Sequence, residues 1–232
     1  AVMSDIPLRI GVIGAGAIGP SHAHSLQQVP QVKLVAVCDM MEEAAAGLAK
    51  EYGVEAFTDL GEMLKVVDAA TLAIPSGLHL DPSIQVIEAG RHLLVEKPLA
   101  GNLSEADALT ECATAGNCIL QVGHIERFNP VYCDINPKDV SPLFVESHRL
   151  APFNSRGTDV SVVLDLMIHD IDLVLSFIDS PVKKIEASGV SIMTSSVDIA
   201  NARVHFENGS VANITSSRVA KDRVRKMKIF QQ

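Results

Sequence analysis

Residues 8–20 read LRIGVIGAGAIGP, and this stretch decides the fold of the first half of the chain. Its apolar beginning predicts a buried strand, after which Gly14, Gly16 and Gly19 follow the spacing G-x-G-x-x-G. In this spacing the first glycine supplies a tight turn, the second lets the backbone approach a pyrophosphate, and the third allows a helix to pack closely on the strand. Pro20 is typical of the first turn of a helix. The stretch therefore predicts a strand, a turn and a helix whose free N–H groups receive a phosphate.

A second apolar run, Val32–Asp39, ends in a carboxylate. Asp39 follows the glycines by about 20 residues, the distance at which a carboxylate accepts hydrogen bonds from an adenosine ribose. Met40 and Met41 offer no cation to a 2′-phosphate, so the sequence favours NAD over NADP. The alternative interpretation makes Asp39 the N-cap of the next helix, and one carboxylate can do both.

The composition is typical of an α/β protein that buries aliphatic strands. The 232 residues are 47% hydrophobic and 4% aromatic, with no tryptophan. A formal net charge of −9 and a pI near 5.3 argue against nucleic acid or a membrane as the main partner and favour a small molecule. The N-terminus shows neither a signal peptide nor a membrane span. Cysteines without metal-type spacing indicate reduced thiols and a cytoplasmic protein; they are Cys38, Cys112, Cys118 and Cys133.

Strands alternate with helices as far as Val122, which predicts a parallel sheet with helices on both faces. Near Gly123 the pattern changes to one long apolar helix, Val160–Ile178, followed by successive strands with tight turns. We therefore expect an α/β protein in which a doubly wound Rossmann domain, residues 1–123, precedes an α+β domain, residues 124–232. The second domain should hold a mostly antiparallel sheet. Its expected strands are residues 143–150, 182–193, 199–206, 210–217 and 226–230.

Polar residues are expected beyond the carboxyl ends of the parallel strands, where open α/β sheets bind their ligands. They are Asp39, the loop with Pro75 and His79, and the triplet Glu96-Lys97-Pro98. Proline restricts the preceding residue to an extended backbone, so Lys97 is aimed by a stiff hinge at the end of a buried strand. A lysine beside a cationic nicotinamide can act as a proton donor or acceptor. The alternative interpretation is a surface lysine that pairs with Glu96.

The predicted long helix is apolar apart from short polar residues on one face. They follow the spacing i, i+4, i+7 and i+11, with Asp170 beside them, and are Asp165, His169, Asp172 and Ser176. A solvated stripe is the alternative, but such a stripe normally contains Lys, Glu and Gln. Short acids that flank one histidine favour a stripe that faces a cleft, in which Asp165 holds the tautomer of His169. No metal is expected, because no third ligand has a recognisable spacing.

Three motifs together resemble the glucose-fructose oxidoreductase/inositol dehydrogenase (Gfo/Idh/MocA) family. They are the glycine turn, Glu96-Lys97-Pro98 after the fifth strand, and Asp165-x-x-x-His169 on the long helix. The stretches Gly123–Pro130 and Asp165–Asp172 further resemble a subgroup that includes UDP-N-acetylglucosamine 3-dehydrogenases. The resemblance covers essentially the whole chain.

The resemblance implies NAD(P)-dependent oxidation of a sugar or cyclitol hydroxyl. His169 or Lys97 removes the hydroxyl proton while a hydride passes to the nicotinamide, Lys97 steadies the developing oxygen, and Asp165 orients His169. The expected substrate is a nucleotide sugar such as UDP-N-acetylglucosamine, oxidised at carbon 3. The alternatives are a free sugar or cyclitol, or a non-catalytic NAD-binding regulatory protein.

The expected binding residues come from both domains. Those for NAD are Gly14, Gly16, Ala17, Ile18, Asp39, Pro75, His79, Glu96 and Lys97. Those for the substrate are Arg127, Asn129, Arg149 and Arg156, with Arg218 as a further diphosphate candidate, because arginine matches phosphate bidentately. The basic run at residues 221–228 is interpreted as an exposed strand face.

Family members extend beyond the length of this chain. The C-terminal part of the second domain is therefore expected to be missing; the alternative is that its sheet is completed in another way. An edge strand left without its neighbour invites association. We expect a homo-oligomer that forms through the sheet of the second domain.

Overall fold

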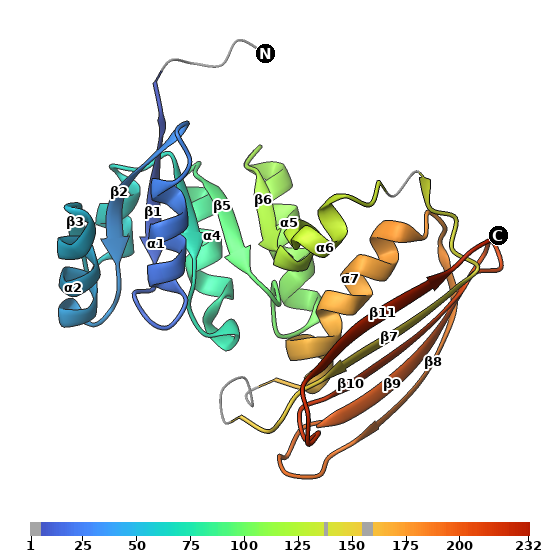
Figure 1. Cartoon of the computed structure of the whole chain (residues 1–232). Coiled ribbons are helices and arrows are strands. Elements are labelled where there is room, and N and C mark those ends of the chain that lie inside the picture. Colours follow the sequence, from blue (N-terminus) through green and yellow to red (C-terminus); the bar gives the residue numbers. More distant parts are fainter. Residues whose placement is uncertain (1–5, 137–138, 155–159) are drawn as a thin grey trace. The chain divides into compact units, whose positions relative to one another are not determined.

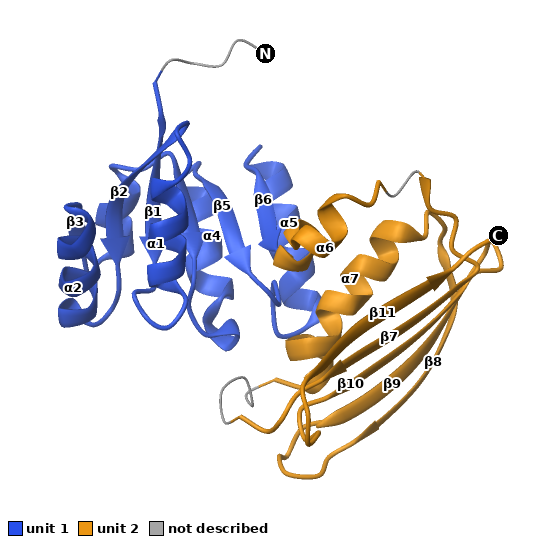
Figure 2. Ribbon diagram, viewed as in Figure 1, with its two compact units in different colours: residues 1–123 blue, residues 124–232 orange. Residues whose placement is uncertain are grey.

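The chain divides into two compact units in a computed structural model that describes residues 6–136, 139–154 and 160–232 (Figures 1 and 2). Unit 1 spans residues 1–123 and unit 2 spans residues 124–232. Within the described ranges, no helix combines the length and the apolar character that a membrane crossing needs.

Unit 1 contains a six-stranded sheet in the order β3-β2-β1-β4-β5-β6 (Figure 1). All neighbouring strands run parallel. The chain order reverses between β1 and β4, which is the place where doubly wound sheets bind their ligands. The strands are β1 (Leu8–Ile13), β2 (Val32–Cys38), β3 (Glu55–Phe57), β4 (Ala69–Leu72), β5 (His92–Glu96) and β6 (Leu120–Gly123).

Helices cover both faces of this sheet. Val12 and Ile13 are neighbours in β1 but belong to different apolar clusters, because successive side chains of a strand point to opposite faces. Leu48 packs in the cluster of Val12, whereas Leu109 packs in the cluster of Ile13. The doubly wound fold predicted from the sequence is thus confirmed. Its helices are α1 (Gly19–Gln27), α2 (Glu42–Tyr52), α3 (Leu60–Leu64), α4 (Leu80–Glu88) and α5 (Leu103–Ala115).

Unit 2 contains a five-stranded sheet in the order β11-β7-β10-β9-β8 (Figure 1). The pair β7 and β10 is parallel, and the other three pairs are antiparallel, so the predicted sheet is confirmed as mostly antiparallel. The strands are β7 (Phe144–Leu150), β8 (Val182–Val190), β9 (Ile199–Phe206), β10 (Val211–Ser217) and β11 (Val224–Phe230).

The long helix of unit 2 is not a uniform α-helix. It begins as a π-helix, η4 (Val163–Met167), and continues as α7 (Ile168–Phe177). A π-helical turn adds a residue to the turn, so it changes which side chains share a face on its two sides. Met167 and Val174 pack with β9 and β10 in the core of the unit. Two short helices precede the sheet, η2 (Ile125–Phe128) and α6 (Pro130–Cys133).

Candidate active site

The turn between β1 and α1 explains the spacing of its glycines. Gly14 has φ +96°, and a Cβ there would lie 2.5 Å from the carbonyl oxygen of Ala73. A Cβ on Gly19 would collide with the carbonyl oxygen of Gly14, whereas a Cβ on Gly16 would meet nothing within 4 Å. Gly14 and Gly19 are therefore required by the turn itself. The open space at Gly16 and at its exposed neighbours Ala17 and Ile18 is what a phosphate needs to approach the start of α1.

Asp39 follows the end of β2 and bonds with the glycine turn. Its Oδ2 accepts a hydrogen bond of 2.8 Å from the N–H of Ala15, and its Oδ1 accepts one of 2.9 Å from the N–H of Met41. Met41 is the N-cap of α2, so the alternative that Asp39 caps this helix is wrong. Each carboxylate oxygen keeps a second lone pair for a ribose hydroxyl. The open glycine turn and this acceptor fit a dinucleotide.

The triplet Glu96-Lys97-Pro98 stands at the end of β5. Glu96 Oε1 lies 2.9 Å from Nε2 of His22 in α1, and both side chains are largely buried. Burial alone would raise the pKa of Glu96, but the hydrogen bond and charge of His22, together with Lys97, lower it overall. Lys97 is half-buried, and its bond to Pro98 is cis. His22 was not among the predicted site residues; its signal in the sequence was its position on the first turns of the helix that the glycines start.

Pro75 and His79 lie on the segment that follows β4. Pro75 is exposed, before the short helix η1 (Ser76–Leu78), while His79 is 1% exposed. The ring nitrogens of His79 lie 3.0 Å from the carbonyl oxygens of Pro98 and Ile74. This placement favours a structural role for His79 over the predicted contact with the cofactor.

In unit 2, Asp165 belongs to η4 and His169 to the first turn of α7, and both are half-buried. The expectation that this stripe faces a cleft is wrong at Asp172. That residue is 8% exposed, and Arg127 donates two hydrogen bonds of 2.6 Å to its carboxylate. A regular spacing of polar residues could not reveal that η2 brings a cation to this face of the helix.

The other predicted substrate residues have partners within unit 2. Asn129 accepts a hydrogen bond of 3.1 Å from the N–H of Val131 and caps α6. Arg149 is buried and donates to Asp170 at 2.8 Å and to Glu126 at 3.1 Å. Burial alone lowers the pKa of Arg149, but these two carboxylates raise it overall. Arg156 lies outside the described residues.

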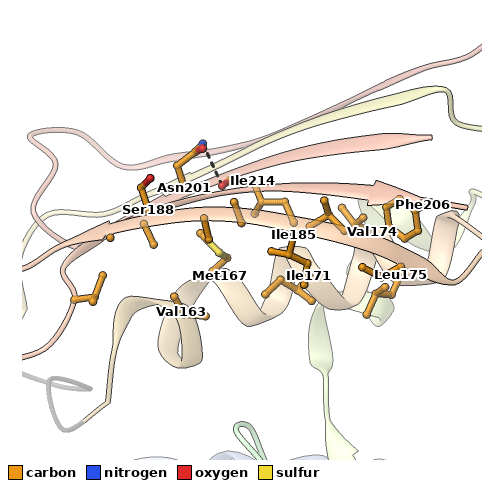
Figure 3. Close-up of a pocket in the computed structure, with 17 residues that line it drawn as sticks. Val163, Met167, Ile171, Val174, Leu175, Ile185, Ser188, Asn201, Phe206 and Ile214 are labelled. Atoms are coloured by element: carbon orange, nitrogen blue, oxygen red, sulfur yellow. Dashed lines mark hydrogen bonds between the residues drawn. The ribbon is translucent and has the colours of Figure 1, made fainter. Parts of the chain in front are cut away.

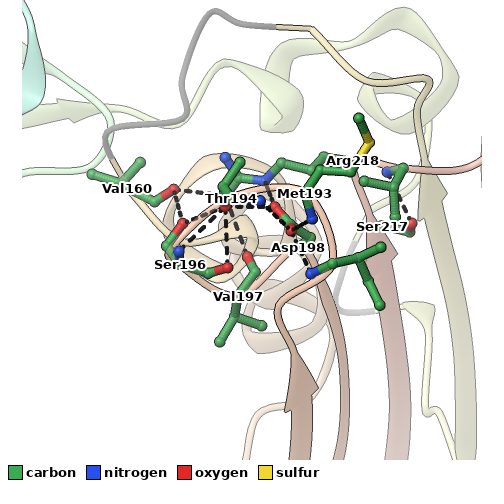
Figure 4. Close-up of polar contacts among 10 residues, drawn as sticks. Val160, Met193, Thr194, Ser196, Val197, Asp198, Ser217 and Arg218 are labelled. Carbon is green, nitrogen blue, oxygen red and sulfur yellow. Dashed lines mark hydrogen bonds and ion pairs between the residues drawn. The ribbon is translucent and has the colours of Figure 1, made fainter.

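Arg218 and Asp198 form part of a polar network at the β8–β9 connection (Figure 4). The Asp198 side chain is buried and accepts hydrogen bonds from the backbone N–H groups of Ile192, Met193 and Thr194. Burial raises the pKa of Asp198, but these bonds lower it well below its ordinary value overall. Arg218 donates to the carbonyl oxygen of Val160 at 2.6 Å, with its Nε 3.6 Å from Asp198.

A polar cavity of about 180 Å³ in unit 2 brings Asp165 together with arginines. Two of these arginines are buried and bound to carboxylates, Arg149 to Asp170 and Arg218 to Asp198. The other two, Arg223 and Arg225, are exposed, and Arg225 lies 3.7 Å from Glu126. Both belong to the basic run at residues 221–228, which was interpreted as an exposed strand face. The missed signal was their separation by one residue, which puts both on one face of an extended chain.

A larger cavity of about 490 Å³ lies between the long helix and strands β8 to β10 (Figure 3). Apolar side chains such as Met167, Ile171 and Ile185 line it, and none of the predicted site residues does. Its polar lining residues are Ser188 and Asn201, so it lacks a titratable side chain that could take a proton during hydride transfer. Among the described residues, no group of three or more His, Cys, Asp and Glu side chains is arranged to hold a metal ion.

The structure thus brings together two sets of predicted residues. In unit 1 the glycine turn contacts Asp39, and α1 contacts Glu96. In unit 2 Asp165 shares a cavity with arginines. Lys97 belongs to unit 1 and His169 to unit 2, and their action on one substrate stays a prediction.

Two family models match the chain. The oxidoreductase family model with an NAD-binding Rossmann fold, GFO_IDH_MocA, matches residues 8–124. The GFO/IDH/MocA C-terminal domain matches residues 121–231.

Individual relatives match over most of the chain. UDP-N-acetylglucosamine 3-dehydrogenase of Acidithiobacillus ferrooxidans is 37% identical over 98% of this chain and 72% of its own length. Its solved structure superimposes with a TM-score of 0.91 and covers 98% of this chain, which spans 75% of that structure. The NAD-dependent scyllo-inositol 2-dehydrogenase of Bacillus subtilis is 28% identical over 92% of this chain and 68% of its own length.

Proposed function

Because the chain belongs to the GFO/IDH/MocA oxidoreductase family, we propose that it oxidises a ring hydroxyl of a nucleotide sugar, with NAD as the hydride acceptor. The specific candidate is UDP-N-acetylglucosamine, oxidised at carbon 3. The family match confirms the predicted NAD cofactor, and the relatives confirm the predicted class of dehydrogenase. The identity of the sugar and the presence of a nucleotide on it are our proposal.

The cavity lined by Asp165, Arg223 and Arg225 is the observation that supports a nucleotide-linked substrate. Arg149 and Arg218 are matched by buried carboxylates. Of the two exposed arginines, Arg225 lies 3.7 Å from Glu126, so Arg223 and the partly matched Arg225 supply the cationic surface of this cavity. A diphosphate is a doubly charged ligand that guanidinium groups bind with paired hydrogen bonds. Asp165 in the same cavity places a proposed catalytic residue near that anion site. The relative that is 37% identical is named for a UDP-sugar substrate, which supports the same choice.

Residues of unit 1 hold the cofactor in this proposal. The N–H groups at the start of α1, next to Gly16, receive the pyrophosphate, and Asp39 accepts hydrogen bonds from the ribose. Lys97 at the end of β5 lies on the segment that meets the nicotinamide. The bound NAD supplies the ring that accepts the hydride.

Side chains of the protein accept the proton that the substrate hydroxyl loses. Oxidation breaks the C–H bond with its electron pair and the O–H bond with loss of a proton, and leaves a ketone. His169 or Lys97 takes that proton as general base, a task that contributes about 10²–10⁴-fold to a rate. Asp165, one turn before His169, orients its imidazole, and Lys97 stabilises the negative charge that develops on the oxygen.

A free cyclitol is the second candidate, and a specific observation favours it. Three of the four arginines at the cavity already pair with carboxylates, which leaves a small net positive charge for a diphosphate; they are Arg149, Arg218 and Arg225. The NAD-dependent scyllo-inositol 2-dehydrogenase of Bacillus subtilis matches 92% of the chain and is named for an uncharged ring.

The absorbance of NADH separates these candidates. Purified protein with NAD is given UDP-N-acetylglucosamine, free N-acetylglucosamine, scyllo-inositol or myo-inositol. We expect kcat/KM to be highest for the UDP-sugar and much lower for free N-acetylglucosamine. Faster oxidation of an inositol favours the second candidate, and NADH binding without any turnover favours a regulatory protein.

We also propose that unit 2 associates with a second copy of the chain through its sheet. Every residue of the edge strand β8 is exposed, apolar Val182, Ile185 and Val190 among them. An exposed strand edge that carries apolar side chains favours association. Light scattering at increasing concentration tests this, and a constant monomer mass contradicts it.

A further inference from the structure

His79 joins two segments of unit 1, at Ile74 and at Pro98, that lie 24 residues apart in the sequence. Its Nε2 lies 3.0 Å from the carbonyl oxygen of Ile74, two residues after the end of β4. Its Nδ1 lies 3.0 Å from the carbonyl oxygen of Pro98 and 3.4 Å from that of Leu99. The ring is buried, so these backbone groups are its polar surroundings rather than water.

The donor in this arrangement can be identified from its acceptors. A carbonyl oxygen only accepts hydrogen bonds, so a ring nitrogen that faces one is satisfied when it carries a hydrogen. Nδ1 faces two such oxygens and Nε2 faces one. The same argument applies to both nitrogens, and the bond that bears on Lys97 is the one that Nδ1, with its hydrogen, donates to the carbonyl oxygen of Pro98, directly after Lys97.

A second histidine holds the residue directly before Lys97. Nε2 of His22 lies 2.9 Å from Oε1 of Glu96, and Glu96 also accepts a hydrogen bond from the backbone N–H of Lys97. The Glu96 carboxylate lies over Gly123, where a Cβ would meet its oxygens at 3.1 and 3.2 Å. The position of Glu96 is therefore restricted on two sides.

We infer that His79 and His22 are positioning residues that hold the two neighbours of Lys97, Pro98 and Glu96, and so fix the direction of the Lys97 side chain. The inference rests on the proposed catalytic role of Lys97. Neither histidine contacts the substrate; both act through Lys97. A small displacement of a positioned catalytic group is enough to lower a rate about 100-fold.

The two histidines use different ring nitrogens, and this gives a reciprocal test. The amide nitrogen of asparagine replaces Nδ1 of a histidine, and the amide nitrogen of glutamine replaces Nε2. His79→Asn therefore keeps the donor to Pro98, and His79→Gln loses it. For His22 the order reverses, because His22→Gln keeps the donor to Glu96 and His22→Asn loses it.

The position of Lys97 can be observed without turnover. Reductive methylation with carbon-13 labels the lysine amines and keeps their charge, and Lys97→Arg identifies the Lys97 resonance by its loss. In the wild type we expect a Lys97 resonance distinct from those of exposed lysines. It should stay there in His79→Asn and His22→Gln, and move towards the exposed lysines in His79→Gln and His22→Asn.

Turnover gives the second readout. We expect kcat to fall at least about tenfold more in His79→Gln than in His79→Asn, and more in His22→Asn than in His22→Gln, with KM for NAD little changed. His92→Asn and His92→Gln are the controls, because His92 stands at the other end of β5 and accepts a hydrogen bond from the N–H of Ile119. Neither control should move the Lys97 resonance.

The outcomes separate positioning from mere stability. The inference is overturned if the Asn and Gln variants of each histidine change the Lys97 resonance and kcat equally, in proportion to their loss of thermal midpoint. It is also overturned if the order of the two variants is reversed. A wild-type Lys97 resonance that coincides with the exposed lysines also overturns it. If the resonances follow the expected order while no sugar is oxidised, the positioning stands and the proposed function fails.

Discussion

Oδ2 of Asp39 accepts a hydrogen bond of 2.8 Å from the backbone N–H of Ala15, so the end of β2 and the glycine turn after β1 are bonded to each other. The same carboxylate accepts a bond of 2.9 Å from Met41. These bonds hold the carboxylate in one place before any ligand arrives. An acceptor that is already ordered loses little conformational freedom when it binds a ribose hydroxyl.

Replacement of Asp39 by asparagine tests this arrangement. One charged acceptor becomes an amide, so we expect the Kd for NADH to rise about tenfold, the effect of losing a hydrogen bond to a charged group. The Kd for NADPH should rise less, because the repulsion of its 2′-phosphate is removed as well. NADH fluorescence measures both constants without background from tryptophan, which this chain lacks.

Asp68→Asn is the matched control for that measurement. Asp68 precedes β4, at the opposite end of the strand from the switch point, and pairs with Arg9. We expect unchanged affinity for NADH. Equal losses in the two variants would contradict the role given to Asp39.

Lys97→Ala and His169→Ala should abolish hydride transfer while the affinity for NADH stays nearly the same. Each removes a group that acts on the proton or the oxygen, so kcat should fall at least about 100-fold. Lys33→Ala, on the exposed part of β2, and His205→Ala, in β9, are the controls. A large loss of NADH affinity in both variants would refute the assigned roles.

Arg223→Gln and Arg225→Gln test the anion site in unit 2. Each removes a cation from the cavity that holds Asp165, so KM for the UDP-sugar should rise about tenfold and kcat should change little. Lys228→Gln removes a cation further along the same strand, where it pairs with Glu146, and should leave KM unchanged. If KM responds equally to all three changes, general charge rather than a defined site is responsible.

The stability of unit 1 should depend on pH through Asp68. The hydrogen bonds of Arg9 lower the pKa of Asp68 to about 2. A lowered pKa in the folded state means that the stabilisation is complete above the unfolded value, about 4, and is lost as the pH falls from about 4 to about 2. The difference in thermal midpoint between the wild type and Arg9→Gln should therefore be constant at neutral pH and shrink below pH about 4. A difference that persists at pH about 2 would contradict this assignment.

Much of unit 1 was predictable because local chemistry determines it. Gly14 adopts a positive φ, and a Cβ on Gly19 would collide with Gly14, so the turn requires glycine at both positions. The motif therefore predicts the turn directly. Alternating strands and helices then imply the parallel sheet. The change of pattern near Gly123 falls at the boundary between the units.

Long-range partners were not predictable in the same way. Nothing near Asp172 in the sequence shows that Arg127 binds it, and nothing near Glu96 indicates His22. The π-helical turn over Val163–Met167 was also missed, because a hydrophobic pattern read at 3.6 residues per turn assumes a uniform helix. The position of Arg223 and Arg225 at the cavity was also unpredictable, because it depends on the pairing of β11 with β7.

The central claim is that a hydride leaves carbon 3 of a UDP-linked N-acetylglucosamine for NAD. The most direct measurement supplies UDP-N-acetylglucosamine with deuterium at carbon 3 and determines the mass of the reduced cofactor by mass spectrometry. We expect NADH that carries one deuterium, together with a 3-keto sugar. Unlabelled NADH, or no reduced cofactor although NAD is bound, would contradict it.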